Sequence, residues 1–175
     1  MRLFTAIDLP PEVRASVDDF IGQLRPLARL GWTLSANLHI TTRFIGDWPE
    51  ERLPELQRAL AALSSRAPIP IRVHGLGLVP NGKSPRILLA HADAPPELSE
   101  LARDLGYAER RAYSPHVTLA RIKSPKGLGP LVTKLAELGD PDFGAFLADR
   151  FFLYQSKPSA AGSVYTKLSE FPFSL

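Results

Sequence analysis

The sequence predicts an α+β fold of two pseudo-two-fold-related lobes, each a mainly antiparallel sheet with helices on its outer face, with a groove between them. Three observations predict this fold. A His-x-Thr motif occurs twice, each copy is followed by an amphipathic segment and two apolar runs, and turn residues join those runs into hairpins. Hairpins make the sheets mainly antiparallel. The 175 residues suit a single domain, residues 1–175, built of two similar lobes.

The elements of the first half follow from local pattern. Residues 2–9 are rich in strand formers and end at two prolines, which predicts a strand. Residues 11–27 carry apolar side chains at helical spacing, and proline is tolerated in a first turn, so a helix should follow. We expect strands at 31–35 and 37–46, and a helix at 50–63 from its spaced leucines. Residues 69–78 and 86–90 form a hairpin closed by the Asn81-Gly82 turn.

The second half repeats this order. Spaced leucines predict a helix at 95–105 that ends at Gly106. A polar segment, 109–111, then leads to a strand at 114–122, whose entry is extended because Pro115 restricts the preceding residue. A short helix at 128–138 and a hairpin of strands 149–155 and 163–169, closed by residues 157–162, complete the chain.

The first motif equips one face of its strand. Alternate side chains of a strand share a face, so His39, Thr41 and Arg43 should point the same way. The second copy, His116-Val117-Thr118, begins 77 residues later. With four histidines and seven threonines in the chain, two chance copies have a probability of roughly one in a hundred.

The spacing after each motif also repeats. The first apolar run begins thirty residues after its histidine in both halves, at Ile69 and at Phe146. We interpret the chain as an internal duplication of a strand, helix and hairpin unit. If the two units face each other, His39 and His116 converge across the groove.

Two facing histidines suit phosphodiester chemistry. Histidine has a pKa of about 6.5, so one copy can be neutral and act as a base while the other is protonated and acts as an acid. Attack on a phosphodiester needs both, because the attacking oxygen loses a proton while the leaving oxygen gains one. The hydroxyls of Thr41 and Thr118 can donate to non-bridging phosphate oxygens, where charge builds in the transition state.

Two arginines are candidates for substrate binding. Arg43 has the parity of His39 and could add positive charge to the groove. Arg121 has the opposite parity to His116, so it reaches the groove only if its strand ends or bulges nearby. A surface or sheet-edge position for Arg121 is equally open.

Composition narrows the function classes. The absence of cysteine excludes disulfides, thiolate metal sites and cysteine nucleophiles. The net charge of +3 is compatible with a phosphate-bearing partner but is far from that of a duplex-coating protein. No apolar run approaches the roughly 20 residues of a membrane span, and Asp8 interrupts the N-terminus too early for a signal peptide. We therefore expect a cytoplasmic protein with no membrane partner, and a monomer.

The two motifs resemble the paired His-x-Thr signatures of the 2H phosphoesterase superfamily. Over nearly the whole chain the likeness is to the RNA 2',3'-cyclic phosphodiesterases, once called 2'-5' RNA ligases. The segments that carry it are Arg2-Leu3-Phe4-Thr5-Ala6-Ile7-Asp8-Leu9-Pro10, Asn37-Leu38-His39-Ile40-Thr41, Pro115-His116-Val117-Thr118-Leu119-Ala120-Arg121 and Leu153-Tyr154-Gln155-Ser156.

The resemblance implies hydrolysis of an RNA 2',3'-cyclic phosphate end to a 2'-phosphate without metal or cofactor. It implies His116 as the general base and His39 as the general acid, although pseudo-symmetry makes the two interchangeable on paper. The expected partner is RNA with a cyclic phosphate end or a small cyclic phosphate nucleotide, and 2'-5' ligation could run in reverse. Family members often have leucine where this chain has Thr42. Its parity points away from the groove, so we expect only packing to change.

Other functions remain open at this point. A metal site is disfavoured because neither motif has a second histidine or a carboxylate on the shared face. His74 and His91 lie outside the motifs, and we expect them to be packing or surface residues. A phosphodiesterase acting on another cyclic or 2'-5' linked nucleotide would use the same residues. A non-catalytic nucleotide- or RNA-binding module could hold a phosphate without turning it over.

Overall fold

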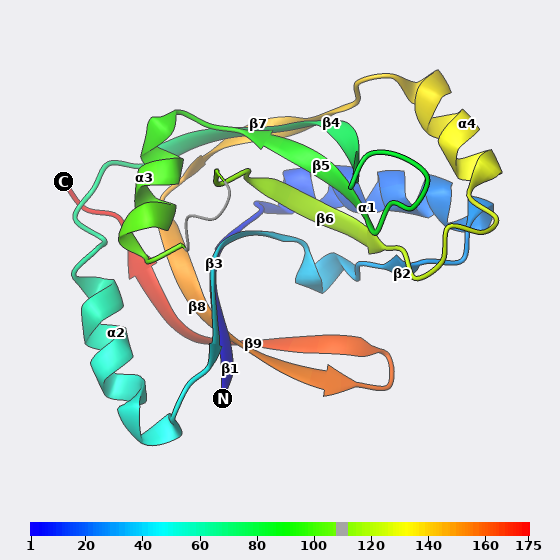
Figure 1. Ribbon diagram of the computed structural model, residues 1–175. Coiled ribbons are helices and arrows are strands. Elements are labelled where there is room, and N and C mark those ends of the chain that lie inside the picture. The colour runs from blue at the N-terminus through cyan, green and yellow to red at the C-terminus, as the bar shows by residue number, and fades with distance from the viewer. Residues whose placement is uncertain (108–111) are drawn as a thin grey trace.

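A computed structural model describes residues 1–107 and 112–175, shown in Figure 1. The expected segment 109–111 lies outside these ranges. The strands are β1 (Arg2–Asp8), β2 (Gly31–Trp32), β3 (His39–Asp47), β4 (Ile69–Val79), β5 (Ile87–Asp93), β6 (His116–Arg121), β7 (Asp142–Ala148), β8 (Arg150–Ser159) and β9 (Gly162–Pro172). The α-helices are α1 (Pro11–Leu24), α2 (Leu53–Ala61), α3 (Pro96–Asp104) and α4 (Gly129–Leu138).

The strands form one curled antiparallel sheet. Its order is β7-β4-β5-β6-β3-β1-β8-β9, with β2 pairing against β6. The predicted α+β class and the two similar halves are confirmed, since β7-β4-β5-β6 mirrors β9-β8-β1-β3 about the centre. The two predicted sheets are joined into one because β3 and β6 pair with each other at Ile40 and Val117.

The two halves exchange their hairpins. The β4–β5 hairpin follows β3 in the chain but pairs with β6, whereas the β8–β9 hairpin follows β6 but pairs with β1, the neighbour of β3. Each motif strand is therefore completed by strands from the other copy of the duplication, or from the N-terminus. This exchange brings the two motif strands to the centre of the sheet.

Three local expectations were wrong. The expected strand 149–155 corresponds to β8, but the strand before it, β7, was not predicted; β7 ends at Ala148 and pairs with β4. The strand expected at 31–35 keeps only Gly31 and Trp32, since a 3₁₀ turn begins at Ser35. The last hairpin is longer than expected and turns tightly into Gly162, whose φ of 115° favours glycine.

The buried face of the sheet packs against helices. α1 contributes Val13, Val17, Phe20 and Leu24 to the core, and its Phe20 ring meets Phe143 on β7 edge to face at 5.1 Å. None of the helices in the described ranges is long and apolar enough to cross a membrane.

Candidate active site

The pairing of Ile40 with Val117 brings the two motifs together. In an antiparallel pair, this register sets His39 beside Thr118 and Thr41 beside His116. Ile40 and Val117 are fully buried, whereas the four motif side chains are all partly exposed on the opposite side. We call this side, which bears His39, Thr41, His116 and Thr118, the motif face.

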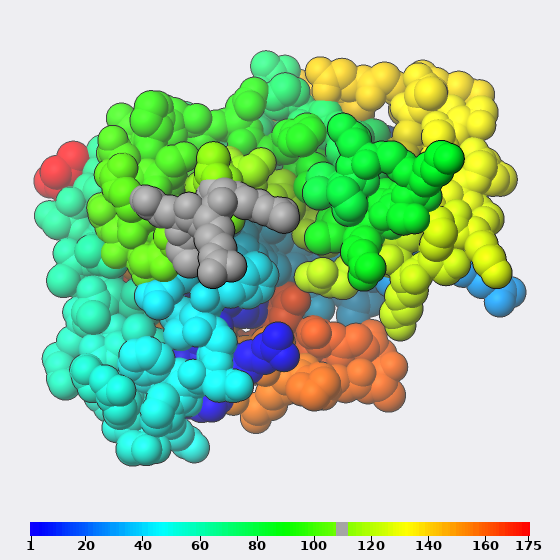
Figure 2. All heavy atoms as spheres, viewed as in Figure 1, coloured from blue at the N-terminus to red at the C-terminus, as the bar shows by residue number. Residues whose placement is uncertain are grey.

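The surface is hollowed near the two motif strands. Figure 2 shows a depression between the β8–β9 hairpin in orange and the β4–β5 loop in green, and Figure 1 shows β3 and β6 in the same view. The four motif side chains are partly exposed, so a ligand can reach them.

Each motif histidine is held in one tautomer by a hydrogen bond to the carbonyl oxygen two residues before it. The Nδ1 of His39 lies 2.6 Å from the carbonyl oxygen of Asn37, and the Nδ1 of His116 lies 2.8 Å from that of Ser114. A carbonyl oxygen can only accept, so Nδ1 carries the hydrogen in both rings. Nε2 is then the atom left to exchange protons with a ligand, and in His39 it lies 2.8 Å from the Thr41 hydroxyl.

The surroundings of His39 act on its pKa in opposite directions, and the net effect, dominated by burial, lowers it. Burial lowers the pKa of His39, and the nearby His116 and Arg14 lower it further. The Asn37 carbonyl and the Asp8 carboxylate raise the same pKa. The rings of Phe4 and Tyr165 pack against the imidazole, with their centroids 5.1 and 5.5 Å from its centroid.

Two hydroxyls that sequence reasoning missed support the motif backbone. The Tyr113 hydroxyl donates to the Thr41 carbonyl at 2.7 Å, and the Thr33 hydroxyl donates to the Thr118 carbonyl at 2.8 Å. Burial raises the pKa of Tyr113, so its hydroxyl stays protonated and donates. Because Tyr113 and Thr33 lie outside both motifs, only tertiary structure reveals these contacts.

A β-bulge at the same position of each motif changes the strand alternation. On β3, Ala6 faces Thr41 and Thr5 faces Arg43, so Thr42 is the extra residue. Phe44 then faces Phe4. Strict alternation, which would put Arg43 on the motif face, fails beyond Thr41, and Phe44 shares that face instead.

The second bulge has the reverse effect on Arg121. On β6, Thr118 faces Leu89 and Ala120 faces Leu88, so Leu119 is extra, three residues after His116 as Thr42 is after His39. Arg121 then faces Ile87, which shares a face of β5 with Leu89. The bulge required for Arg121 to reach the motif face is therefore present.

Arg43 is used elsewhere. Its guanidinium donates to the carbonyl of Leu105, just past the end of α3, and packs against Gly106. The predicted glycine stop at Gly106 is confirmed, with a φ of 95°. A side chain at Gly106 would lie 3.1 Å from the Arg43 guanidinium, so the glycine also makes room for the arginine.

The side chain of Thr42 lies where parity placed it. Thr42 is fully buried away from the motif face, and its hydroxyl pairs with the equally buried Thr5 hydroxyl at 2.7 Å. Thr42 therefore packs under the motif and does not face a ligand.

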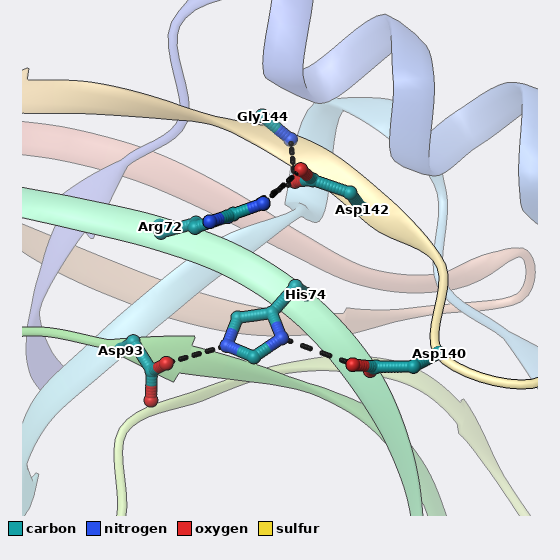
Figure 3. Close-up of polar contacts among 6 residues, drawn as sticks. All are labelled: Arg72, His74, Asp93, Asp140, Asp142 and Gly144. Atoms are coloured by element: carbon teal, nitrogen blue, oxygen red, sulfur yellow. Dashed lines mark hydrogen bonds and ion pairs between the residues drawn. The ribbon is translucent and has the colours of Figure 1, made fainter.

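The other two histidines lie on the neighbouring strands. His74 on β4 contacts the carboxylates of Asp93 and Asp140, and Arg72 beside it pairs with Asp142, as Figure 3 shows. The hydrogen bond with Asp93 raises the pKa of His74. These exposed contacts link β4, β5 and the start of β7. His91 on β5 faces His116 across the strands.

Comparison with known proteins places this geometry in a family. The family model described as LigT like Phosphoesterase matches residues 7–89, which include the first motif. A Thermus thermophilus protein named RNA 2',3'-cyclic phosphodiesterase is 34% identical, over 98% of this chain and 89% of its own length. The chain belongs to the LigT-like phosphoesterases, which are 2H phosphoesterases. A Methanocaldococcus jannaschii relative of the same name is 30% identical over 97% of this chain and 99% of its own.

Solved structures of LigT-like phosphoesterases agree with the fold. The Thermus thermophilus protein TT0787 superposes with a TM-score of 0.83 at 30% identity, covering 99% of this chain and 98% of that one. Escherichia coli LigT, at 24% identity and a TM-score of 0.75, covers the same shares. The full-length matches include the second motif, which lies beyond the residues matched by the family model.

Proposed function

We propose that this LigT-like phosphoesterase hydrolyses RNA 2',3'-cyclic phosphate ends to a 2'-phosphate and a free 3'-hydroxyl. The curated relatives named for this activity cover nearly the whole chain. The observation that carries the proposal is the Ile40–Val117 register, which puts two imidazoles and two hydroxyls on one face.

In the proposed mechanism the two histidines transfer protons on opposite sides of phosphorus. Nε2 of His116 removes a proton from water as the water oxygen attacks phosphorus. Nε2 of His39, protonated beforehand, gives its proton to the 3'-oxygen as the bond from phosphorus to that oxygen breaks. Both rings keep their Nδ1 hydrogen on a carbonyl throughout, so each presents the required nitrogen.

Thr41 and Thr118 are proposed to stabilise the phosphorane-like transition state. Their hydroxyls donate to the non-bridging oxygens, where negative charge increases. The Thr41 hydroxyl lies 2.8 Å from His39 Nε2, so it must turn from the imidazole to the phosphate when substrate binds. Arg121, brought to this face by the second bulge, is proposed to pair with a substrate phosphate.

The donor set favours catalysis without a metal. The motif face offers two imidazoles and two hydroxyls, whereas a catalytic zinc usually has three protein ligands from histidine, carboxylate or thiolate. Asp8, which lies opposite His39 on β1, is already paired with Tyr154 and Lys167. Reverse 2'-5' ligation is proposed to use the same groups with their roles exchanged.

The test is turnover of an oligonucleotide that ends in a 2',3'-cyclic phosphate, in EDTA, with ³¹P NMR of the product. We expect a 2'-phosphate, and His39→Ala and His116→Ala should each lower kcat by about 10²-fold or more. His74→Ala is the matched control, because this histidine lies outside the motif face, and it should retain activity. Unchanged rates in both motif variants, or activity that EDTA abolishes, would overturn the mechanism.

The same assay separates the substrate classes. Cyclic mononucleotides and 2'-5' linked dinucleotides compete as alternative substrates, and we expect a lower kcat/KM for each than for the cyclic phosphate end of RNA. Binding of these ligands without any product would instead identify a non-catalytic nucleotide-binding module.

A further inference from the structure

The strands that flank the two motifs carry different residues at equivalent positions. On β1, Asp8 lies opposite His39. On β5, His91 lies opposite His116. Ala6 and Leu89 likewise face Thr41 and Thr118, so the pseudo-two-fold axis that relates His39 to His116 also relates Asp8 to His91. One motif histidine has a carboxylate beside it, and the other has an imidazole.

Asp8 is held in place by groups from two further strands. The Tyr154 hydroxyl on β8 donates to one carboxylate oxygen of Asp8, and Lys167 Nζ on β9 lies 2.7 Å from the other. Burial and Asp8 both raise the pKa of Tyr154, so the tyrosine remains a donor. The side chain of Asp8 is only 19% exposed, so its charge is poorly screened by solvent.

His91 cannot act in the same way. Its ring leans over Gly77 on β4, where an added Cβ would lie 3.2 Å from its Nε2, and it is exposed to solvent. An imidazole carries no negative charge, so it cannot supply the Coulombic attraction that a carboxylate supplies at the equivalent position.

We propose that Asp8 is the positioning residue that helps His39 to hold the proton it donates, and that the equivalent position beside His116, which His91 occupies, offers no such carboxylate. This inference rests on the proposed function, in which one histidine is the acid and the other the base. It breaks the pseudo-symmetry that leaves the two roles interchangeable. Tyr154 orients the Asp8 carboxylate, while Lys167 limits how strongly it acts.

The charged and titratable groups around His39 set the size of this effect. They are Asp8 on β1, Arg14 on α1, His116 on β6, Tyr154 on β8, and Tyr165 and Lys167 on β9. Among the groups that shift the His39 pKa, Asp8 is the side chain that raises it, and it offsets part of the lowering by burial, Arg14 and His116. Loss of that carboxylate should therefore lower the pKa of His39 further.

The first experiment titrates the imidazole NMR signals of the full chain without substrate. Asp8→Asn should lower the pKa of His39, and Lys167→Met should raise it, because the lysine no longer offsets the carboxylate. His91→Asn is the control and should leave His39 unchanged. His91→Asp should raise the pKa of His116. These readings do not depend on turnover, so they test the inference even if the proposed activity fails.

The second experiment follows kcat/KM against pH with the cyclic phosphate substrate. The rate falls as pH rises through the pKa of the acid, so Asp8→Asn should move this limb to lower pH and Lys167→Met to higher pH. At pH 8, Asp8→Asn should lower kcat/KM by about three- to tenfold. A structural role alone would make both variants slower with no opposite shifts, and that result, or an unmoved limb, overturns the inference.

Discussion

Ile40 on β3 and Val117 on β6 lie opposite each other at the centre of the sheet, and neither exposes any side-chain surface. The four motif side chains project from the other side of these two strands. The core packing of Ile40 and Val117 and the positions of the four motif side chains therefore depend on the same pairing of β3 with β6. A change in the core at this point should reach the motif face.

Truncation of Ile40 tests this coupling. Ile40→Ala leaves a cavity beneath the strand pair and should lower the free energy of unfolding by about 2–5 kcal/mol, whereas Ile40→Val should cost about 1 kcal/mol. We also expect kcat to fall in the alanine variant under conditions where it is fully folded, because β3 can shift against β6. Urea unfolding and turnover of the cyclic phosphate substrate measure the two effects. Full kcat in a destabilised Ile40→Ala protein would contradict the coupling.

The threonine hydroxyls should act in the transition state. Thr118→Val keeps the shape of the side chain and removes its donor, so kcat should fall by about 10²-fold with little change in KM. Thr118→Ser keeps the hydroxyl and should retain most of the activity. Steady-state kinetics decide the matter, and a valine variant that changes only KM would show that the hydroxyl binds the ground state instead.

The two arginines should separate binding from stability. Arg121→Ala should raise KM about tenfold by removing a charge-assisted contact to phosphate, and should leave unfolding unchanged because Arg121 is exposed. Arg43→Ala removes a charged donor from the Leu105 carbonyl, so it should lower the free energy of unfolding by about 1–3 kcal/mol and spare KM. If the two variants exchange these effects, the bulge at Leu119 does not bring Arg121 to the substrate.

Much of this fold could be predicted from the sequence, because many of its elements are specified by residues close together in the chain. The duplicated His-x-Thr motif, the spaced leucines and the Asn81-Gly82 turn each fix an element without long-range contacts. The exchange of hairpins between the halves could not be predicted, since nothing in the sequence of β5 or β8 specifies that β5 pairs with β6 and β8 with β1. The pairing that separates β7 from β8 is equally long-range.

In the candidate site, too, the positions that depend on local spacing could be predicted and those that depend on strand pairing could not. Alternation in a strand is enough to place His39 with Thr41 and His116 with Thr118, because each pair is two residues apart. The same rule fails for both arginines: it predicts that Arg43 lies on the motif face and Arg121 does not, and the structure shows the opposite. The reason is that each strand contains a bulge, and a bulge is recognised only from the pairing with the neighbouring strand.

The supporting residues also lie beyond the reach of local pattern. Asp8 is far in sequence from Tyr154 and Lys167, which face each other in the β8–β9 hairpin, and the three meet because β1 pairs with β8. Asp8 is recognised as a neighbour of His39 only once the pairing of β1 with β3 is known.

The buried hydroxyl pair under the first motif gives a test that separates packing from catalysis. Thr5→Val or Thr42→Val alone leaves the remaining hydroxyl without its partner in the core, which should cost about 1–3 kcal/mol of unfolding free energy. The double variant replaces both by apolar groups of similar shape, so it should cost less than the sum of the two. Urea unfolding of the four proteins gives the coupling energy. All four should keep the wild-type kcat, because neither hydroxyl reaches the motif face, and strictly additive costs would mean that the pair contributes no mutual stabilisation.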